Sequence, residues 1–145
     1  KALSPGVNDT STALMCVEYL TSILTRLAGR QFPSVHWHQG DTLRVIAIVP
    51  RVEGLVAEAF DQISSSAEEN VAILARLLSA FDAIGSLTIR PSYLRVLDEQ
   101  LQCIAELADR TIEASHDRVW IERRMSEVRE ILDAQSVLCT EEQKA

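Results

Sequence analysis

A turn leads into the first helix of the chain at residues 4–28, which read SPGVNDTSTALMCVEYLTSILTRLA. The proline of this stretch fixes its own φ angle and the glycine after it accepts a positive φ angle, so the chain is expected to change direction there. Asp9 follows where the N-cap of a helix belongs. Its carboxylate is expected to accept a hydrogen bond from the backbone amide of Ser11 or Thr12 and to complement the helix dipole.

The residues after Asp9 predict an amphipathic helix that ends at about Ala28, because Gly29 is a natural stop. Apolar residues recur there with the three-four spacing of a helix face that packs inward. The residues expected to face inward are Ala13, Cys16, Val17, Leu20, Ile23, Leu24 and Leu27.

The spacing changes to the alternation of a β-strand after Phe32-Pro33. A two-stranded antiparallel hairpin is therefore predicted at residues 34–49, with its turn at Gln39-Gly40-Asp41. Because an isolated hairpin is marginally stable in water, this hairpin is expected to lean on the helices.

Four more amphipathic helices are predicted after the hairpin, each from a stripe of apolar residues at helical spacing. They are expected to begin at about Pro50, Ala67, Pro91 and His116 and to end near Ile63, Gly85, Ile112 and Leu132. The sequence therefore predicts a mostly α fold of the α+β class, a five-helix bundle with one two-stranded antiparallel β-hairpin between helices one and two. One domain is expected over residues 1–134, including the hairpin, followed by a polar C-terminal tail at 135–145.

The bulk composition excludes several classes of protein. With 145 residues, of which 47% are hydrophobic, the chain is long enough for one core but not for two comfortable ones. Its formal net charge of −7 provides no general electrostatic footprint for nucleic acid, so we expect no nucleic-acid partner. No apolar run approaches the ~20 residues that a transmembrane helix needs, and we therefore expect a soluble domain. Cys16, Cys103 and Cys139 are expected to be reduced thiols, the first two in the core.

Polar side chains crowd the predicted helix start, where free amides favour a small-ligand or anion site. The candidate binding residues are Ser4, Asn8, Asp9 and Thr12. The carboxylate of Asp9 weighs against an anion, because like charges repel. Two other interpretations stay open: the stretch is only a turn with a helix cap, or it is a surface on which another part of the parent protein docks.

The other residue patterns predict no catalytic site, metal site or cofactor. His36 and His38 share a strand face, but two ligands on one strand make only half of a metal site. Trp120 lies beside arginines and off the apolar seam of the last predicted helix, a setting typical of interface anchors. Tyr93 lies off the seam of the preceding helix. We expect Trp120 and Tyr93 to lie at an interface and the chain to form a homo-oligomer.

Three runs of residues carry a resemblance to a known family. They are ALSPGVND at residues 2–9, GDTLRV at 40–45 and EAFDQI at 58–63. With these runs the chain resembles the domain-of-unknown-function 2254 family of predicted bacterial membrane proteins. That family usually has a proline where this chain has Thr10, so the turn is expected to be less rigid here.

The resemblance implies a soluble domain that follows membrane-spanning helices, on the cytoplasmic face of the bacterial cell membrane. The chain opens at Lys1 without an initiator methionine or a signal-peptide pattern, as an excised piece of a longer protein would. Its expected partner is therefore the transmembrane region of its own parent protein, and it is expected to reach the membrane only through the missing N-terminal segment. The family supplies no activity, cofactor or catalytic residue.

Two hypotheses about function follow. In the first, the chain is a regulatory or assembly domain of an integral membrane protein such as a channel or a transporter. In the alternative, it is a small-ligand-sensing, anion-sensing or enzymatic domain with a site around Ser4–Thr12. The first fits the sequence better, because apolar helix faces are plentiful and convergent reactive groups are not.

Overall fold

The computed structural model of the chain describes residue 3 and residues 9–30, 34–47, 52–88 and 90–142. Within these residues it contains five helices and one β-hairpin, which confirms the predicted mostly α fold with the hairpin between the first and second helices. In chain order the elements are α1 (Thr10–Ala28), β1 (His36–Gln39), β2 (Thr42–Ile46), α2 (Val52–Ser65), α3 (Val71–Ser86), α4 (Pro91–Thr111) and α5 (Ser115–Glu142).

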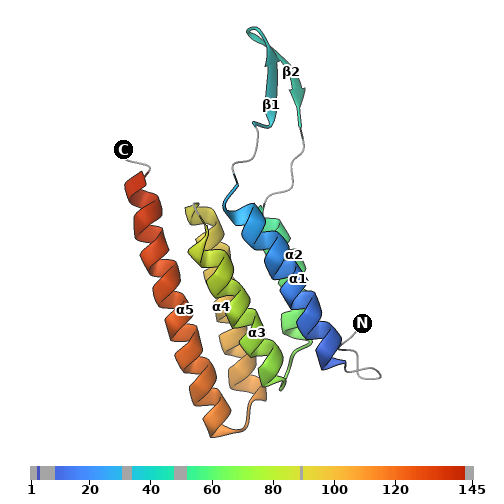
Figure 1. Ribbon diagram of the computed structural model, residues 1–145, viewed down its shortest axis with the longest axis vertical. Coiled ribbons are helices and arrows are strands. Elements are labelled where there is room, and N and C mark those ends of the chain that lie inside the picture. Colours follow the sequence, from blue (N-terminus) through green and yellow to red (C-terminus); the bar gives the residue numbers. More distant parts are fainter. Residues whose placement is uncertain (1–2, 4–8, 31–33, 48–51, 89, 143–145) are drawn as a thin grey trace.

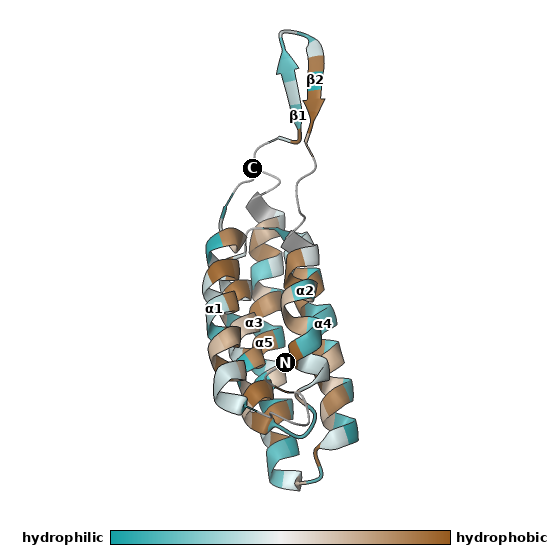
Figure 2. Cartoon of the chain, turned by 90° about the vertical axis from the view of Figure 1, so that its right-hand side faces the viewer, coloured by the Kyte–Doolittle hydropathy of each residue, from teal (hydrophilic) through white to brown (hydrophobic). Residues whose placement is uncertain are grey.

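The helices form an up-and-down bundle (Figure 1). α1, α3 and α5 run in one direction and α2 and α4 run in the other (Figure 1). α1 lies against α3, α2 lies against α4, and α5 packs on both α3 and α4 at one end of these two layers (Figure 2). On the opposite side of the bundle α1 and α2 lie against each other, and no described helix covers their outer faces.

α3 forms the centre of the core because it contacts all four other helices. Its buried apolar side chains form a broad face instead of one narrow stripe, and Ala72, Arg76 and Ser79 lie exposed on the other side. They are Ile73, Leu74, Leu77, Leu78, Ala80, Phe81 and Ile84. Phe81 meets Phe60 of α2 edge to face, with ring centroids 5.4 Å apart and ring planes at 72°. Such a pair stabilises the packing beyond its buried area.

α3 begins four residues later than the sequence predicts. The helix was expected from Ala67, but Ala67 is buried in the connection before the helix and the first helical residue is Val71. The reason is Asn70, whose side-chain oxygen accepts a hydrogen bond of 3.3 Å from the amide of Ile73. Asparagine at an N-cap satisfies an amide that the helix itself cannot, so Asn70 fixes the start.

The described part of the predicted polar tail, residues 135–142, is helical and continues α5. Its inner face packs on the link between α3 and α4. The side-chain nitrogen Nε2 of Gln135 donates to the backbone oxygen of Thr88 at 2.8 Å, and the Cys139 thiol lies 3.7 Å from the same oxygen. The polar composition of this segment does not end the helix. A buried residue every three to four positions is enough to keep one face of the helix packed.

The hairpin does not lean on the bundle, so that expectation is wrong for the described residues. It extends beyond the end of α1 along the long axis of the molecule (Figure 1), and every residue of β1 and β2 is exposed. Gly40 has a φ angle of +59° in the turn, a left-handed conformation that glycine adopts without steric cost. The hairpin thus has a well-defined local structure and no described helix to support it.

The cysteines also differ from the expectation. Cys16 and Cys103, expected in the core, are exposed, whereas Cys139 is buried. On α1 the buried face runs through Ala13, Val17 and Leu24. Cys16 therefore lies on the outer side of a helix that has neighbours on one side only.

Candidate functional site

The start of α1 is a capped helix terminus, as predicted. The amide of Thr12 donates to Oδ1 of Asp9 at 3.0 Å, and the hydroxyl of Thr12 donates to Oδ2 of the same carboxylate. These two hydrogen bonds, the hydroxyl first and the amide second, lower the pKa of Asp9 from its ordinary value. Asp9 is therefore held as a carboxylate that serves its own helix.

A second helix start lies directly beside the first. The side-chain nitrogen of Asn70 donates to the hydroxyl of Thr10 at 2.9 Å, while its oxygen caps α3. One amide side chain thus ties together the starts of two helices that run in the same direction. An asparagine before an apolar run is a helix-start signal in the sequence, but its contact with Thr10 is not.

The described part of the predicted ligand site therefore acts as a cap. Asp9 and Thr12 bind each other, and an anion placed there would meet the carboxylate of Asp9. Ser4 and Asn8, the other two predicted binding residues, lie outside the described residues. A ligand at this turn remains a prediction.

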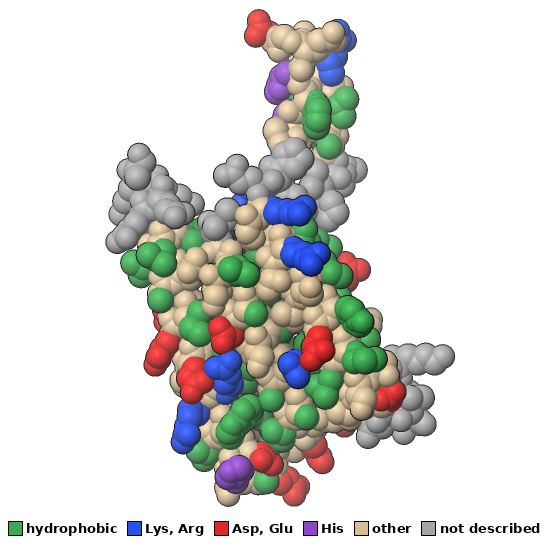
Figure 3. Space-filling model, in the orientation of Figure 1, with side chains coloured by type: hydrophobic (Ala, Val, Ile, Leu, Met, Phe, Trp, Pro, Cys, Tyr) green, Lys and Arg blue, Asp and Glu red, His purple; other side chains and the backbone are tan. Residues whose placement is uncertain are grey.

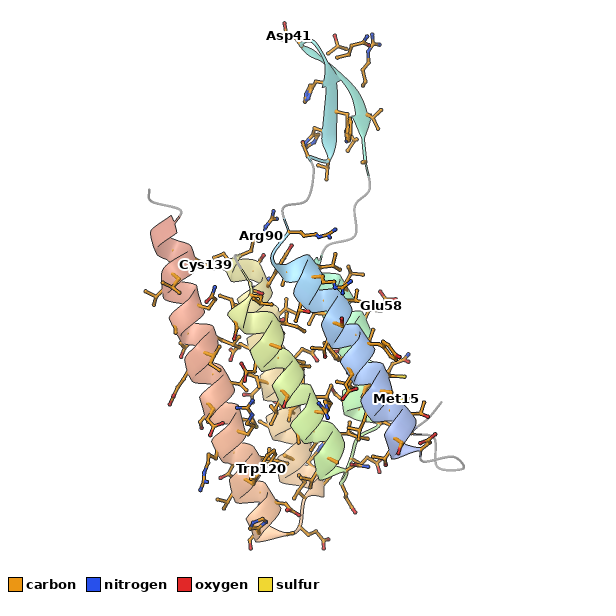
Figure 4. The ribbon with its side chains drawn as sticks, viewed as in Figure 1. Met15, Asp41, Glu58, Arg90, Trp120 and Cys139 are labelled. Carbon is orange, nitrogen blue, oxygen red and sulfur yellow. The ribbon has the colours of Figure 1, made fainter. Side chains whose placement is uncertain are left out.

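The start of α5 carries the predicted interface tryptophan. Trp120 is 40% exposed and the neighbouring Val119 is 54% exposed. A hollow of about 300 Å³ lies beside them, and Figure 4 shows Trp120 near the lower end of α5. The hollow is lined by Ser115, His116, Val119, Trp120 and Arg123. All five belong to one helix, so the hollow is a groove along an outer face and not a cleft between elements.

Tyr93, the second predicted interface residue, cannot offer a surface. It is 3% exposed, with the guanidinium carbon of Arg90 5.9 Å from the centre of its ring. α4 packs against α2 on one side and α5 on another, and its buried face is therefore wider than one seam. The prediction of Tyr93 at an interface is wrong for this reason.

An exposed apolar surface on α1 was not predicted from the sequence. Met15, Tyr19 and Ile23 are 52%, 72% and 55% exposed, although Ile23 was expected to face inward. They are spaced by four residues and so lie on one face of the helix. Of the thirteen large hydrophobic residues exposed in the described part of the chain, eight lie between Met15 and Ile46. Figure 3 shows hydrophobic side chains along the α1 edge and on the hairpin.

The best-connected charged group of the bundle joins α3 to α5. Arg124 donates to Asp82 of α3 and to Glu127 of its own helix, each at 2.8 Å. The hydrogen bond to Glu127 is the main cause that raises the pKa of Arg124, and Asp82 adds to it. The pairing within α5 follows from the sequence, whereas the contact with Asp82 depends on the packing. This group is structural, because the contact with Asp82 holds α5 against α3 and the contact with Glu127 supports α5 itself.

Among the described residues, no three or more histidine, cysteine or acidic side chains are grouped so that they could bind a metal ion. No helix among them is both long and apolar enough to cross a membrane. The family described as Predicted membrane protein (DUF2254) matches residues 1–83, which include α1, the hairpin, α2 and most of α3. No match to the chain was found among curated proteins or solved structures.

Proposed function

Because this chain belongs to the DUF2254 family of predicted membrane proteins, we propose that it is a regulatory or assembly domain of a bacterial integral membrane protein. In this proposal the domain is soluble and lies on the cytoplasmic side of the membrane. The observation that carries the proposal is the exposure of large apolar side chains on the outer faces of both α1 and α5. Exposed apolar surface of this kind marks contact with another protein.

The domain would act through contacts between helix faces. Membrane helices of the parent protein would concentrate these domains in two dimensions, so a weak contact between copies would be enough to form a symmetric oligomer. Trp120 is the proposed anchor of one such contact, since tryptophan beside arginine is favoured at the centre of interfaces. Arg123 lines the same groove as Trp120.

The alternative function, ligand or anion sensing around Ser4–Thr12, has less support. One backbone amide at the start of α1 already donates to the Asp9 side chain, and one at the start of the neighbouring α3 donates to Asn70. We therefore propose a domain without catalytic activity. A thermal-shift screen with inorganic phosphate and common metabolites addresses the alternative, because a ligand present at 100 times its Kd adds about 2.7 kcal/mol of stability.

Sedimentation velocity at tens of micromolar tests the assembly proposal. The wild-type chain is expected to sediment above its monomer mass of 16.1 kDa, and Trp120→Asn is expected to weaken the association at least about tenfold. Val137→Asn is the matched control, because Val137 is 59% exposed on the same helix but lies outside the groove. A wild-type chain that sediments only as a monomer would overturn the proposal.

A further inference from the structure

Two apolar surfaces, one on α1 and one on the hairpin that follows it in the chain, lack a partner in the described residues. The first is the arm, which we define as residues 34–47, the segment that contains the hairpin. The second is the α1 stripe, which consists of Met15, Tyr19 and Ile23. The arm follows α1 in the chain, and the stripe lies on the exposed side of α1, where Figure 4 labels Met15 near the start of the helix.

The arm has one face that is apolar at its centre. Trp37 pairs with Val45 across the two strands, so their side chains share a face. They are 59% and 54% exposed. On the other face two histidines pair with Leu43 and Ile46, which makes that face mixed. An unsupported two-stranded hairpin is marginally stable at best, so a surface that covers the Trp37–Val45 face would stabilise the arm.

Neither edge of the hairpin is suited to pairing with a further strand, so the Trp37–Val45 face is the better docking surface. Arg44 is the extra residue of a bulge in β2, between the pairs Trp37–Val45 and His38–Leu43. A charge and a bulge on an edge strand both oppose pairing with another strand. At the start of β1 the hydroxyl of Ser34 accepts a hydrogen bond from the backbone amide of His36 and donates one to its carbonyl, at 3.1 Å each. Packing of side chains therefore explains the arm better than addition of a strand.

The charge distribution favours contact between the arm and a bundle over contact between two bundles. Residues 34–47 contain one acidic and one basic residue, Asp41 and Arg44, so the formal charge of −7 lies entirely on the rest of the chain. Two acidic bundles repel each other, whereas a neutral arm approaches one without that cost. Beside the stripe, the carboxylate of Glu18 is neutralised by Arg76 at 3.2 Å.

We propose that two copies of this chain exchange their arms, with the Trp37–Val45 face of each arm packed on the α1 stripe of the other copy. The inference rests on the proposed assembly function and adds a contact to it. Its symmetry is closed, since each copy gives one arm and receives one. α5 lies at the opposite end of the bundle, so the Trp120 groove stays available for a second contact (Figure 1).

The exposed apolar side chains of the two surfaces would supply a substantial part of a dimer interface. A buried aromatic side chain covers about 150–250 Å². Allowing for their partial exposure, two copies each of Trp37 and Tyr19 would supply roughly a third of the 1,200–2,000 Å² that stable interfaces bury. Val45, Met15 and Ile23 of both copies would extend the contact.

Sedimentation of variants in a Trp120→Asn background separates the two contacts. The Trp120→Asn protein is expected to remain a dimer, and adding Trp37→Asn or Tyr19→Asn is expected to raise the dimer Kd at least about tenfold. Adding Val137→Asn, a change at an exposed position on α5, is expected to leave the Kd unchanged. If wild type associates but Trp120→Asn alone gives a monomer, the arm exchange is overturned and the assembly function stands. If wild type is itself a monomer, both fall.

Cross-linking identifies which surface the arm contacts. Cys16 is exposed beside the stripe, and Thr42 lies on the Trp37 face of the arm. In a Cys103→Ser background, Thr42→Cys treated with a short bismaleimide is expected to give a covalent dimer that disappears when Cys16→Ser is added. A cross-link within one monomer would show that the arm folds on its own α1 and would overturn the exchange. Absence of any Cys16-dependent link would overturn it as well.

Discussion

α3 and α1 are apolar helices that run side by side in the same direction, but a wider face of α3 is covered by other helices. α3 contacts four helices and buries Leu77 and Phe81 completely. α1 contacts α2 and α3 and leaves Met15, Tyr19 and Ile23 outside. The difference teaches that an apolar residue on a helix is buried only if the fold supplies a neighbour there. Where it does not, the residue is available for a partner.

The largest effect is expected where α2 meets α3. Phe60→Ala removes a side chain that is 0% exposed and stacked edge to face on Phe81, and it should lower the free energy of unfolding by about 3–5 kcal/mol. Ile23→Ala on the α1 stripe is the control and should cost the monomer far less, because Ile23 is 55% exposed. Urea unfolding in dilute protein measures both. Equal losses would contradict the distinction between α3 and α1.

Alanine substitutions at two glycines compare a buried position on α3 with an exposed position on α2. A methyl group on Gly85 of α3 would lie 2.4 Å from Cδ2 of Leu132, whereas a methyl on Gly54 of α2 would meet no atom within 4 Å. Gly85→Ala should therefore destabilise the bundle by about 1–3 kcal/mol. Gly54→Ala should stabilise it by up to about 1 kcal/mol through helix propensity. Thermal unfolding of the two variants should move in opposite directions.

Substitution of two arginines compares the ion pair between α3 and α5 with the ion pair between α3 and α1. Arg124→Gln breaks the contact with Asp82 of α3, whose side chain is 27% exposed, and should cost about 1 kcal/mol. Arg76→Gln breaks the contact with Glu18 of α1, whose side chain is 55% exposed, and should cost a few tenths of that. Urea midpoints at low salt measure the difference. A larger loss at Arg76 would mean that α1 is held more tightly than its exposure indicates.

The two helix caps are expected to contribute about as much as the ion pair between Arg124 and Asp82. Asp9→Ala should lower the Tm by about 3 °C at neutral pH, and Asn70→Ala should lower it more, because Asn70 also holds Thr10. Thr12 lowers the pKa of Asp9. A lowered pKa in the folded state means that the cap contributes fully above the ordinary value and loses its contribution as the pH falls below it. The Asp9→Ala difference should thus shrink below about pH 4, and a constant difference would contradict the capping role.

Local features of the fold are predictable from the sequence because their causes are local. The Asp9 cap joins residues three apart, the turn at Gly40 needs a positive φ angle, and Pro91 suits the first turn of α4. The spacing of apolar residues predicts each helix for the same reason.

Features that depend on residues far apart in the chain cannot be predicted from local sequence patterns. Asn70 and Thr10 are sixty residues apart, so their hydrogen bond has no local signal. Tyr93 is buried because α4 has neighbours on several sides, and Ile23 is exposed because α1 does not. The periodicity of a helix gives its apolar face but not the width of the face that the fold covers.

Hydrogen exchange at two protein concentrations tests most directly whether the apolar surface of the N-terminal region is an assembly surface. Amides of β1 and β2 are expected to exchange rapidly in dilute protein and to become protected at tens of micromolar, because cover by a second copy stabilises the arm. Amides of α3 should be protected at both concentrations, since that helix is buried within one chain. Exchange in the hairpin that is independent of concentration would contradict the account.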